Sequence, residues 1–121
     1  MVNRKHIIEA VRTHLRAESA LDKAEWLALF SEKAVIEDPV GLATWCGITE
    51  IRSQFWANVE RAQPKLELLE DVIVCGNEAI AVLSAEINRD DARVTVSPIV
   101  VNFQYDDKGK VARLRSFIDY G

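Results

Sequence analysis

The first half of the chain carries apolar residues at three- and four-residue spacing, a pattern that predicts amphipathic helices. The predicted helices cover residues 3–19, 23–30 and 48–63. On the first, the apolar stripe consists of Ile7, Ile8, Val11, His14 and Leu15. Asp22 is a suitable N-cap for the second helix, and Pro64 ends the third.

The second half of the chain changes to β-rich apolar runs, which predict strands over residues 66–74, 79–88, 93–105 and 110–120. Turn residues separate these runs at 76–77, 90–91 and 106–109, so consecutive strands should pair antiparallel. One earlier strand is predicted over residues 34–38. It stops at the turn formed by Pro39, Val40 and Gly41.

Helices gathered at the start and strands gathered at the end predict an α+β fold, in which three N-terminal helices pack on one face of a curved, mostly antiparallel sheet. With 121 residues the chain is expected to form one domain, residues 1–121. A curved sheet half covered by helices encloses a cone-shaped interior, and small ligands bind in such concavities.

Charge and composition limit the kinds of ligand and partner that we expect this chain to bind. The chain holds 15 Lys and Arg against 19 Asp and Glu, so it lacks the basic excess that binding nucleic acid needs. The cysteines, Cys46 and Cys75, lack the spacing of a zinc site, and we expect no metal or other cofactor. No apolar run is long enough for a signal peptide or a membrane span, which favours a cytoplasmic protein with reduced thiols.

Asp38 is the first candidate for chemistry. Strand alternation places it on the same face as Ala34 and Ile36. A carboxylate at the apolar end of a strand either caps the following turn or lies desolvated with a raised pKa, in which case it can act as a general base. The residues alone leave both interpretations open.

His14 and the aromatic residues are similarly ambiguous. His14 lies on or beside the apolar stripe of the first helix, where it is either a hydrogen-bonded core residue or part of a site. Pocket wall and plain core are both open for Trp26, Trp45, Phe55 and Trp56. Arg113 and Arg115 alternate with Leu114 and are expected on a solvated or interface face without chemistry.

Several runs in this chain recur, in order and at similar spacing, in one known family. They are residues 27–30, the run Ala34-Val35-Ile36-Glu37-Asp38-Pro39-Val40-Gly41, Gly47, Ile51-Arg52, Phe55-Trp56-Ala57-Asn58, Asn77-Glu78-Ala79, Pro98-Ile99 and Gly109-Lys110-Val111. Over nearly its whole length the chain thus resembles the bacterial ketosteroid isomerases, which belong to the NTF2-like or SnoaL-like superfamily.

The resemblance implies a conical α+β barrel, commonly a homodimer packed through its sheets. It also implies that Asp38 is the base that moves a proton from the carbon beside a ketone to the far end of a dienolate. The family stabilises the oxyanion with a tyrosine and a protonated aspartic acid. His14 stands at the tyrosine position, and Val100, or Val101 after a one-residue shift, stands at the aspartic acid position.

Both family donors are therefore replaced, and a valine cannot donate a hydrogen bond at all. Neutral His14 can donate one ring N–H. Asn102, on the same strand face as Val100, and Tyr120, on the same face as Leu114 and Ile118, are stand-in candidates. The predicted site has Asp38 and His14 as catalytic residues and a ligand wall of Trp26, Phe30, Phe55, Trp56, Val100, Asn102, Leu114, Ile118 and Tyr120.

Three functional hypotheses follow. The first is an isomerase-like enzyme in which Asp38 moves a proton next to a carbonyl of a hydrophobic small molecule and His14 polarises the oxygen. The second uses Asp38 and His14 to activate water or a hydroxyl, as in the hydrolase, dehydratase and cyclase relatives of the superfamily. The third is a non-catalytic module for small-molecule binding or dimerisation. None involves nucleic acid or a membrane.

Overall fold

The computed structural model describes residues 2–120 of the chain, and its first element is the helix α1 (Arg4–Ser19). The side chain of Asn3 caps this helix by accepting a 2.8 Å hydrogen bond from the backbone N–H of His6. The buried face of α1 consists of Ile7, Val11, His14, Leu15 and Ala17. The predicted first helix is confirmed.

The second helix, α2 (Lys23–Leu27), is shorter than the predicted segment 23–30. Asp22 caps it as expected, by accepting from the N–H of Glu25 at 3.1 Å. The prediction was wrong at the C-terminal end, because Phe30 begins the strand β1 (Phe30–Glu37). The carbonyl of Leu29 already accepts a hydrogen bond from Val111 of the sheet, so strand pairing ends the helix.

The third predicted helix, residues 48–63, forms one continuous helical segment with a π-helical turn in its middle. It comprises α3 (Ile48–Glu50), η1 (Ile51–Phe55) and α4 (Trp56–Ala62). Gln63 ends it in the left-handed conformation, with φ of 43°, directly before Pro64. The apolar residues Ile51, Phe55, Trp56 and Val59 form its buried face.

Seven strands form one sheet in the order β2-β1-β7-β6-β5-β3, with β4 also paired to β5. The strands after β1 are β2 (Thr44–Cys46), β3 (Lys65–Leu68), β4 (Ile73–Cys75), β5 (Glu78–Arg89), β6 (Ala92–Tyr105) and β7 (Val111–Ile118). Among the strands of residues 2–120, only β1 and β7 pair in parallel. The sheet is thus mostly antiparallel, as predicted.

Two strand predictions need correction. Residues 66–74 form two strands, β3 and β4, rather than one, because the polar pair Glu70 and Asp71 interrupts the run and each piece pairs with a different part of β5. The short strand β2 was not predicted. Its three residues have no clear alternation, and it exists because the chain folds back after Pro39 and pairs with the end of β1.

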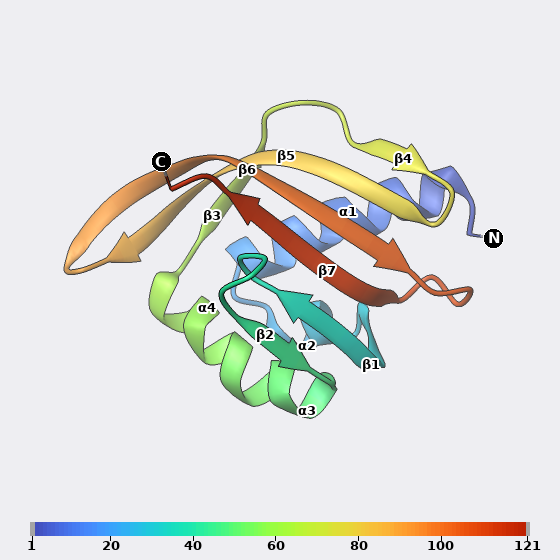
Figure 1. Cartoon of the computed structure of the whole chain (residues 1–121), viewed down its shortest axis with the longest axis horizontal. Helices are drawn as coiled ribbons and strands as arrows, with labels where there is room; N and C mark the ends of the chain where they lie inside the picture. The colour runs from blue at the N-terminus through green and yellow to red at the C-terminus, as the bar shows by residue number, and fades with distance from the viewer. Residues whose placement is uncertain (1, 121) are drawn as a thin grey trace.

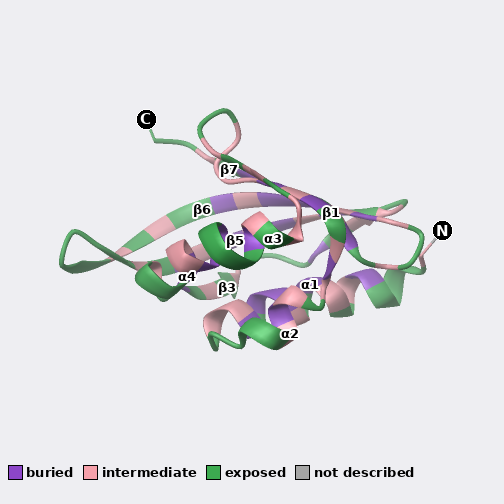
Figure 2. Cartoon of the chain, turned by 90° about the horizontal axis from the view of Figure 1, so that it is seen from below, coloured by how far each residue is buried: buried purple, intermediate pink, exposed green. Residues whose placement is uncertain are grey.

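The helices cover one face of the curved sheet, and Figure 2 shows buried residues along the layer where α1 and α2 meet it. In Figure 1 the strands β5, β6 and β7 cross the molecule diagonally, with α3 and α4 beside β1 and the short strand β2. This is the predicted α+β cone. Within residues 2–120 no helix is long and apolar enough to cross a membrane.

Candidate active site

A cavity of about 520 Å³ opens between the concave face of the sheet and the helices α1 and α4. Its wall is mainly apolar. The apolar residues of the wall include Trp45, Phe55, Leu66, Leu83, Ile87, Val96, Ile99, Val101, Phe103, Leu114 and Ile118. A cavity of this volume is in the range of sites that hold a small organic molecule.

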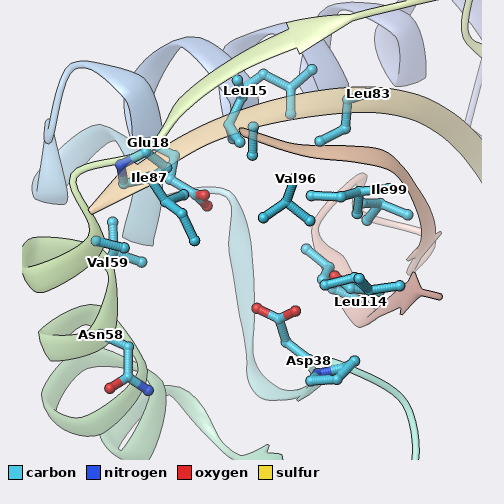
Figure 3. Close-up of a pocket in the computed structure, with 18 of the residues that line it drawn as sticks. Leu15, Glu18, Asp38, Asn58, Val59, Leu83, Ile87, Val96, Ile99 and Leu114 are labelled. Carbon is cyan, nitrogen blue, oxygen red and sulfur yellow. The ribbon is translucent and has the colours of Figure 1, made fainter. Parts of the chain in front are cut away.

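Asp38 directly follows β1, and its carboxyl group points into this cavity (Figure 3). Burial raises the pKa of Asp38 to about 6; the negative charge of Glu18 acts in the same direction, and a hydrogen bond from Ser116 opposes both. The turn after Asp38 is closed by backbone bonds, from Val40 N–H to the carbonyl of Ser116 and from Leu42 N–H to that of Pro39. The Asp38 carboxyl group thus has the geometry of a desolvated group in a pocket.

His14 projects from α1 and is only 4% exposed. Its ring lies against Trp26, Phe30 and Phe103, with centroid distances of 5.7, 5.8 and 5.0 Å. Nε2 is 3.4 Å from Oε1 of Glu18. Nδ1 is buried and has no hydrogen-bond partner among the described residues. His14 therefore touches the cavity, but its one paired nitrogen faces Glu18.

Glu18 is the functional candidate that the sequence analysis missed. Its Oε1 accepts a 3.1 Å hydrogen bond from Nε1 of Trp26, and its side chain is 14% exposed. The carboxyl group points into the same cavity as that of Asp38 (Figure 3). A signal was available: Glu18 follows His14 by four residues, which places both on one face of α1.

A family model for the SnoaL-like domain matches residues 11–114. The chain belongs to the SnoaL-like domain family. The match includes α1 from Val11 onward, Asp38 and most of the cavity wall, so it extends over the site as well as the scaffold.

Solved structures agree with this assignment. The SnoaL-like protein is 26% identical to the epoxide hydrolase/cyclase-like enzyme SalBIII, described for pyran ring formation in the polyether salinomycin, with a TM-score of 0.88 over 99% of this chain and 95% of that one. It shares its fold with RV0760c from Mycobacterium tuberculosis in complex with estradiol-17beta-hemisuccinate, at 19% identity and a TM-score of 0.84 over 95% of both chains.

A third solved structure, an LEH-like epoxide hydrolase from M. tuberculosis, is 19% identical to this chain. Its TM-score is 0.83 over 95% of this chain and 84% of that one. At this identity the likeness bears on the fold alone.

The structure brings together part of the predicted ligand wall. Phe55, Leu114, Ile118 and Tyr120 line the cavity with Asp38 and His14. Trp26, Phe30 and Trp56 do not: they are almost fully buried and pack on one another, with ring centroids 4.6 and 4.9 Å from that of Trp26. These three residues form the core that supports His14 and Glu18.

Val100 and Asn102 also lie outside the cavity wall, in contrast to the prediction. Successive residues of β6 face opposite sides of the sheet, and its cavity face carries Ile99, Val101 and Phe103. On the other side, the Asn102 amide donates to the Ala79 carbonyl at 3.2 Å. Neither residue can contact a ligand in the cone, and β6 contributes no polar side chain to its wall.

Proposed function

We propose that this SnoaL-like protein is an acid–base catalyst that acts on an apolar small molecule, with Asp38 as the group that transfers the proton. The observation that carries the proposal is a half-buried carboxyl group that points into a mainly apolar cavity and has a pKa raised to about 6. A pKa near the working pH suits a group that must both take up and release a proton.

One candidate reaction is the shift of a proton next to a carbonyl, as the resemblance to ketosteroid isomerases implies. Asp38 would remove a proton from the carbon beside the carbonyl and return it at the far end of the dienolate, so the substrate gains and loses no atoms. The intact run Glu37-Asp38-Pro39-Val40-Gly41 favours this reaction. A steroid-sized ligand is in keeping with RV0760c, a protein of the same fold, whose structure holds a steroid ester.

The second candidate is the opening of an epoxide by water or by a hydroxyl group of the same molecule. Protonated Asp38 would give its proton to the epoxide oxygen as the C–O bond breaks, and a second acceptor would take the proton of the attacking oxygen. Two observations favour it: a second carboxyl group, that of Glu18, lies in the cavity, and the 26% identical SalBIII is an epoxide hydrolase/cyclase-like enzyme.

The deciding experiment compares the wild type with Asp38→Asn on two substrates, androst-5-ene-3,17-dione and cyclohexene oxide. Isomerisation is followed by the ultraviolet absorbance of the conjugated enone and epoxide opening by chromatography of the diol. Turnover of either substrate that is lost in the variant supports the proposal. Turnover that the variant retains overturns it, and binding of the steroid without turnover of either substrate favours a non-catalytic binding module.

The homodimer that the resemblance implies belongs to the same proposal. The face of the sheet away from the cavity carries Phe117, which is 41% exposed, with the Arg115 guanidinium 5.2 Å from its ring centroid. An isologous contact through this face would cover the exposed ring. Sedimentation equilibrium at micromolar concentration should give twice the chain mass, and a monomer under these conditions would refute the dimer.

A further inference from the structure

Two carboxyl groups from different elements meet at the polar end of the cavity. Glu18 comes from α1 and Asp38 from the end of β1, and their carboxyl groups point into the same space (Figure 3). Trp26 donates to Glu18 at 3.1 Å, and Nε2 of His14 lies 3.4 Å from the same oxygen. Trp26 thus orients the Glu18 side chain, and an ionised carboxylate only accepts hydrogen bonds.

Donors that a ligand could reach from this end are scarce. The neighbouring strand β6 offers Ile99, Val101 and Phe103, none of which carries a donor side chain. The Ser116 hydroxyl already donates to Asp38, and the free ring nitrogen of His14 is buried. With Asp38 ionised, a ligand whose oxygen is only an acceptor, such as a ketone, meets few donors there.

The remaining ionisable groups of the cavity wall do not change this balance. Arg89, at the end of β5, and Tyr120, after β7, are both exposed to solvent. The half-buried Asn58, on α4, is not ionisable: its amide oxygen accepts a hydrogen bond from Arg61, and its amide NH2 group is a donor on the α4 side of the wall. Among the ionisable groups of the wall, His14 and Glu18 lie on the helix α1, which faces Asp38 across the cavity.

We infer that Glu18 is a specificity-determining residue of this site, and that it selects apolar ligands that present a hydroxyl group to the space between Glu18 and Asp38. The inference rests on the second candidate reaction of the proposed function, in which a hydroxyl group of the ligand attacks, since it names the substrate class of that same cavity. A hydroxyl donates to the Glu18 carboxylate with a charge-assisted hydrogen bond, whereas a ketone in its place sets two acceptors against each other.

The test uses two steroids with one skeleton and different oxygen chemistry. Androst-4-ene-3β,17β-diol presents hydroxyl donors, and androst-4-ene-3,17-dione presents only acceptors. Titration calorimetry gives both affinities for the wild type, for Glu18→Gln and for the control Glu9→Gln, which removes the same charge from an exposed position of α1. We expect the wild type and Glu9→Gln to bind the diol about tenfold more tightly than the dione.

In Glu18→Gln the preference should fall to about twofold or less, because an amide offers both a donor and an acceptor. If this variant does not fold, as judged by thermal unfolding, Glu18→Leu replaces it with the same expectation. The inference is overturned if the wild type binds the diol and the dione equally well. It is also overturned if the variants at position 18 keep the preference for the diol, or if the wild type binds neither steroid. Turnover by the wild type and Asp38→Asn decides the proposed function separately, since these affinities involve no reaction.

Discussion

Glu37 and Asp38 are adjacent carboxylic acids that lie on opposite faces of one sheet. The Glu37 carboxylate accepts hydrogen bonds from the Arg113 side chain and lies 3.3 Å from Nε of Arg115. The hydrogen bond from Arg113 lowers the pKa of Glu37, although burial acts against it. Burial raises the pKa of Asp38, which has Glu18 rather than an arginine nearby. The outer face thus fixes a carboxylate as a charge, while the inner face leaves one able to exchange its proton.

The difference teaches that the strand position, not the residue type, decides the chemistry. Both residues are carboxylic acids and neighbours in sequence, and a single step along a strand reverses the face. The arginines of β7 follow the same rule, because Arg113 and Arg115 alternate with Leu114 and Ser116, which line the cavity. The carboxylate paired with arginines lies outside the cone, and the ionisable pair Asp38 and Glu18 lies inside it.

Replacing each of the two acids gives the largest contrast. Asp38→Asn should lower kcat by about 10³-fold on the substrate that the protein turns over, because general acid–base catalysis contributes roughly 10²- to 10⁴-fold. Glu37→Gln should change kcat by about threefold or less, since its carboxylate faces away from the cavity. Steady-state kinetics on both variants checks this. Equal losses in the two variants would end the distinction between the faces.

The pH profile sharpens the same contrast. If Asp38 is a base, kcat/KM rises about tenfold per pH unit up to pH 6 and is level above it; if Asp38 is an acid, kcat/KM falls as the pH rises above 6. Glu18→Gln should move the midpoint to lower pH, because it removes a charge that raises the pKa of Asp38. Glu37→Gln should leave the midpoint unchanged. A profile that is flat from pH 4 to 8 contradicts the assignment of Asp38.

The two faces of β6 can be tested with one substitution at neighbouring positions. Val101→Asp places a carboxyl group in the cavity, where apolar surroundings should keep it protonated and able to donate to a ketone. Val100→Asp places it on the outer face. We expect Val101→Asp to raise the isomerisation of androst-5-ene-3,17-dione about tenfold and Val100→Asp to leave it unchanged. A larger gain from Val100→Asp would reverse our assignment of the faces.

Sequence periodicity predicted the parts of the fold that local pattern controls. The apolar stripe of α1 and the strands β5, β6 and β7 lie close to their predicted positions. The errors arise where tertiary contacts overrule the local pattern. Phe30 continues an apolar helical run but pairs with Val111, and β2 forms only because β1 lies beside it. Pairing with distant residues leaves no periodic trace in so short a segment.

The candidate site was predictable where it depended on alternation along one strand. Asp38 shares a face with Ala34 and Ile36, which are both fully buried. Strand alternation alone could not decide between Val100 and Val101, because it shows which residues share a face of β6 but not which face of the sheet is concave. Pairing of β6 with β5 and β7 decides that. Glu18 was missed because a glutamate near a helix end is ordinarily solvated, and only Trp26 and the cavity give it another role.

The smallest expected effect is on stability, and it has opposite signs at the two acids. The pKa of Asp38, about 6, lies above its ordinary value of 3.8, so the folded protein binds that proton more tightly than the unfolded chain does. Ionisation therefore costs stability increasingly between about pH 4 and pH 6, and the full cost is present above that range.

Asp38→Asn removes this cost. At pH 8 it should raise the free energy of unfolding by about 1 to 3 kcal/mol, because one pKa unit corresponds to about 1.4 kcal/mol, and at pH 4 the gain should nearly vanish. Glu37→Gln should instead lower stability at pH 8, because its pKa is lowered and its charged form is the one that the fold favours. Urea unfolding at both pH values measures the differences. If Asp38→Asn is no more stable than the wild type at pH 8, Asp38 is not a desolvated group, and the contrast between the two faces loses its electrostatic basis.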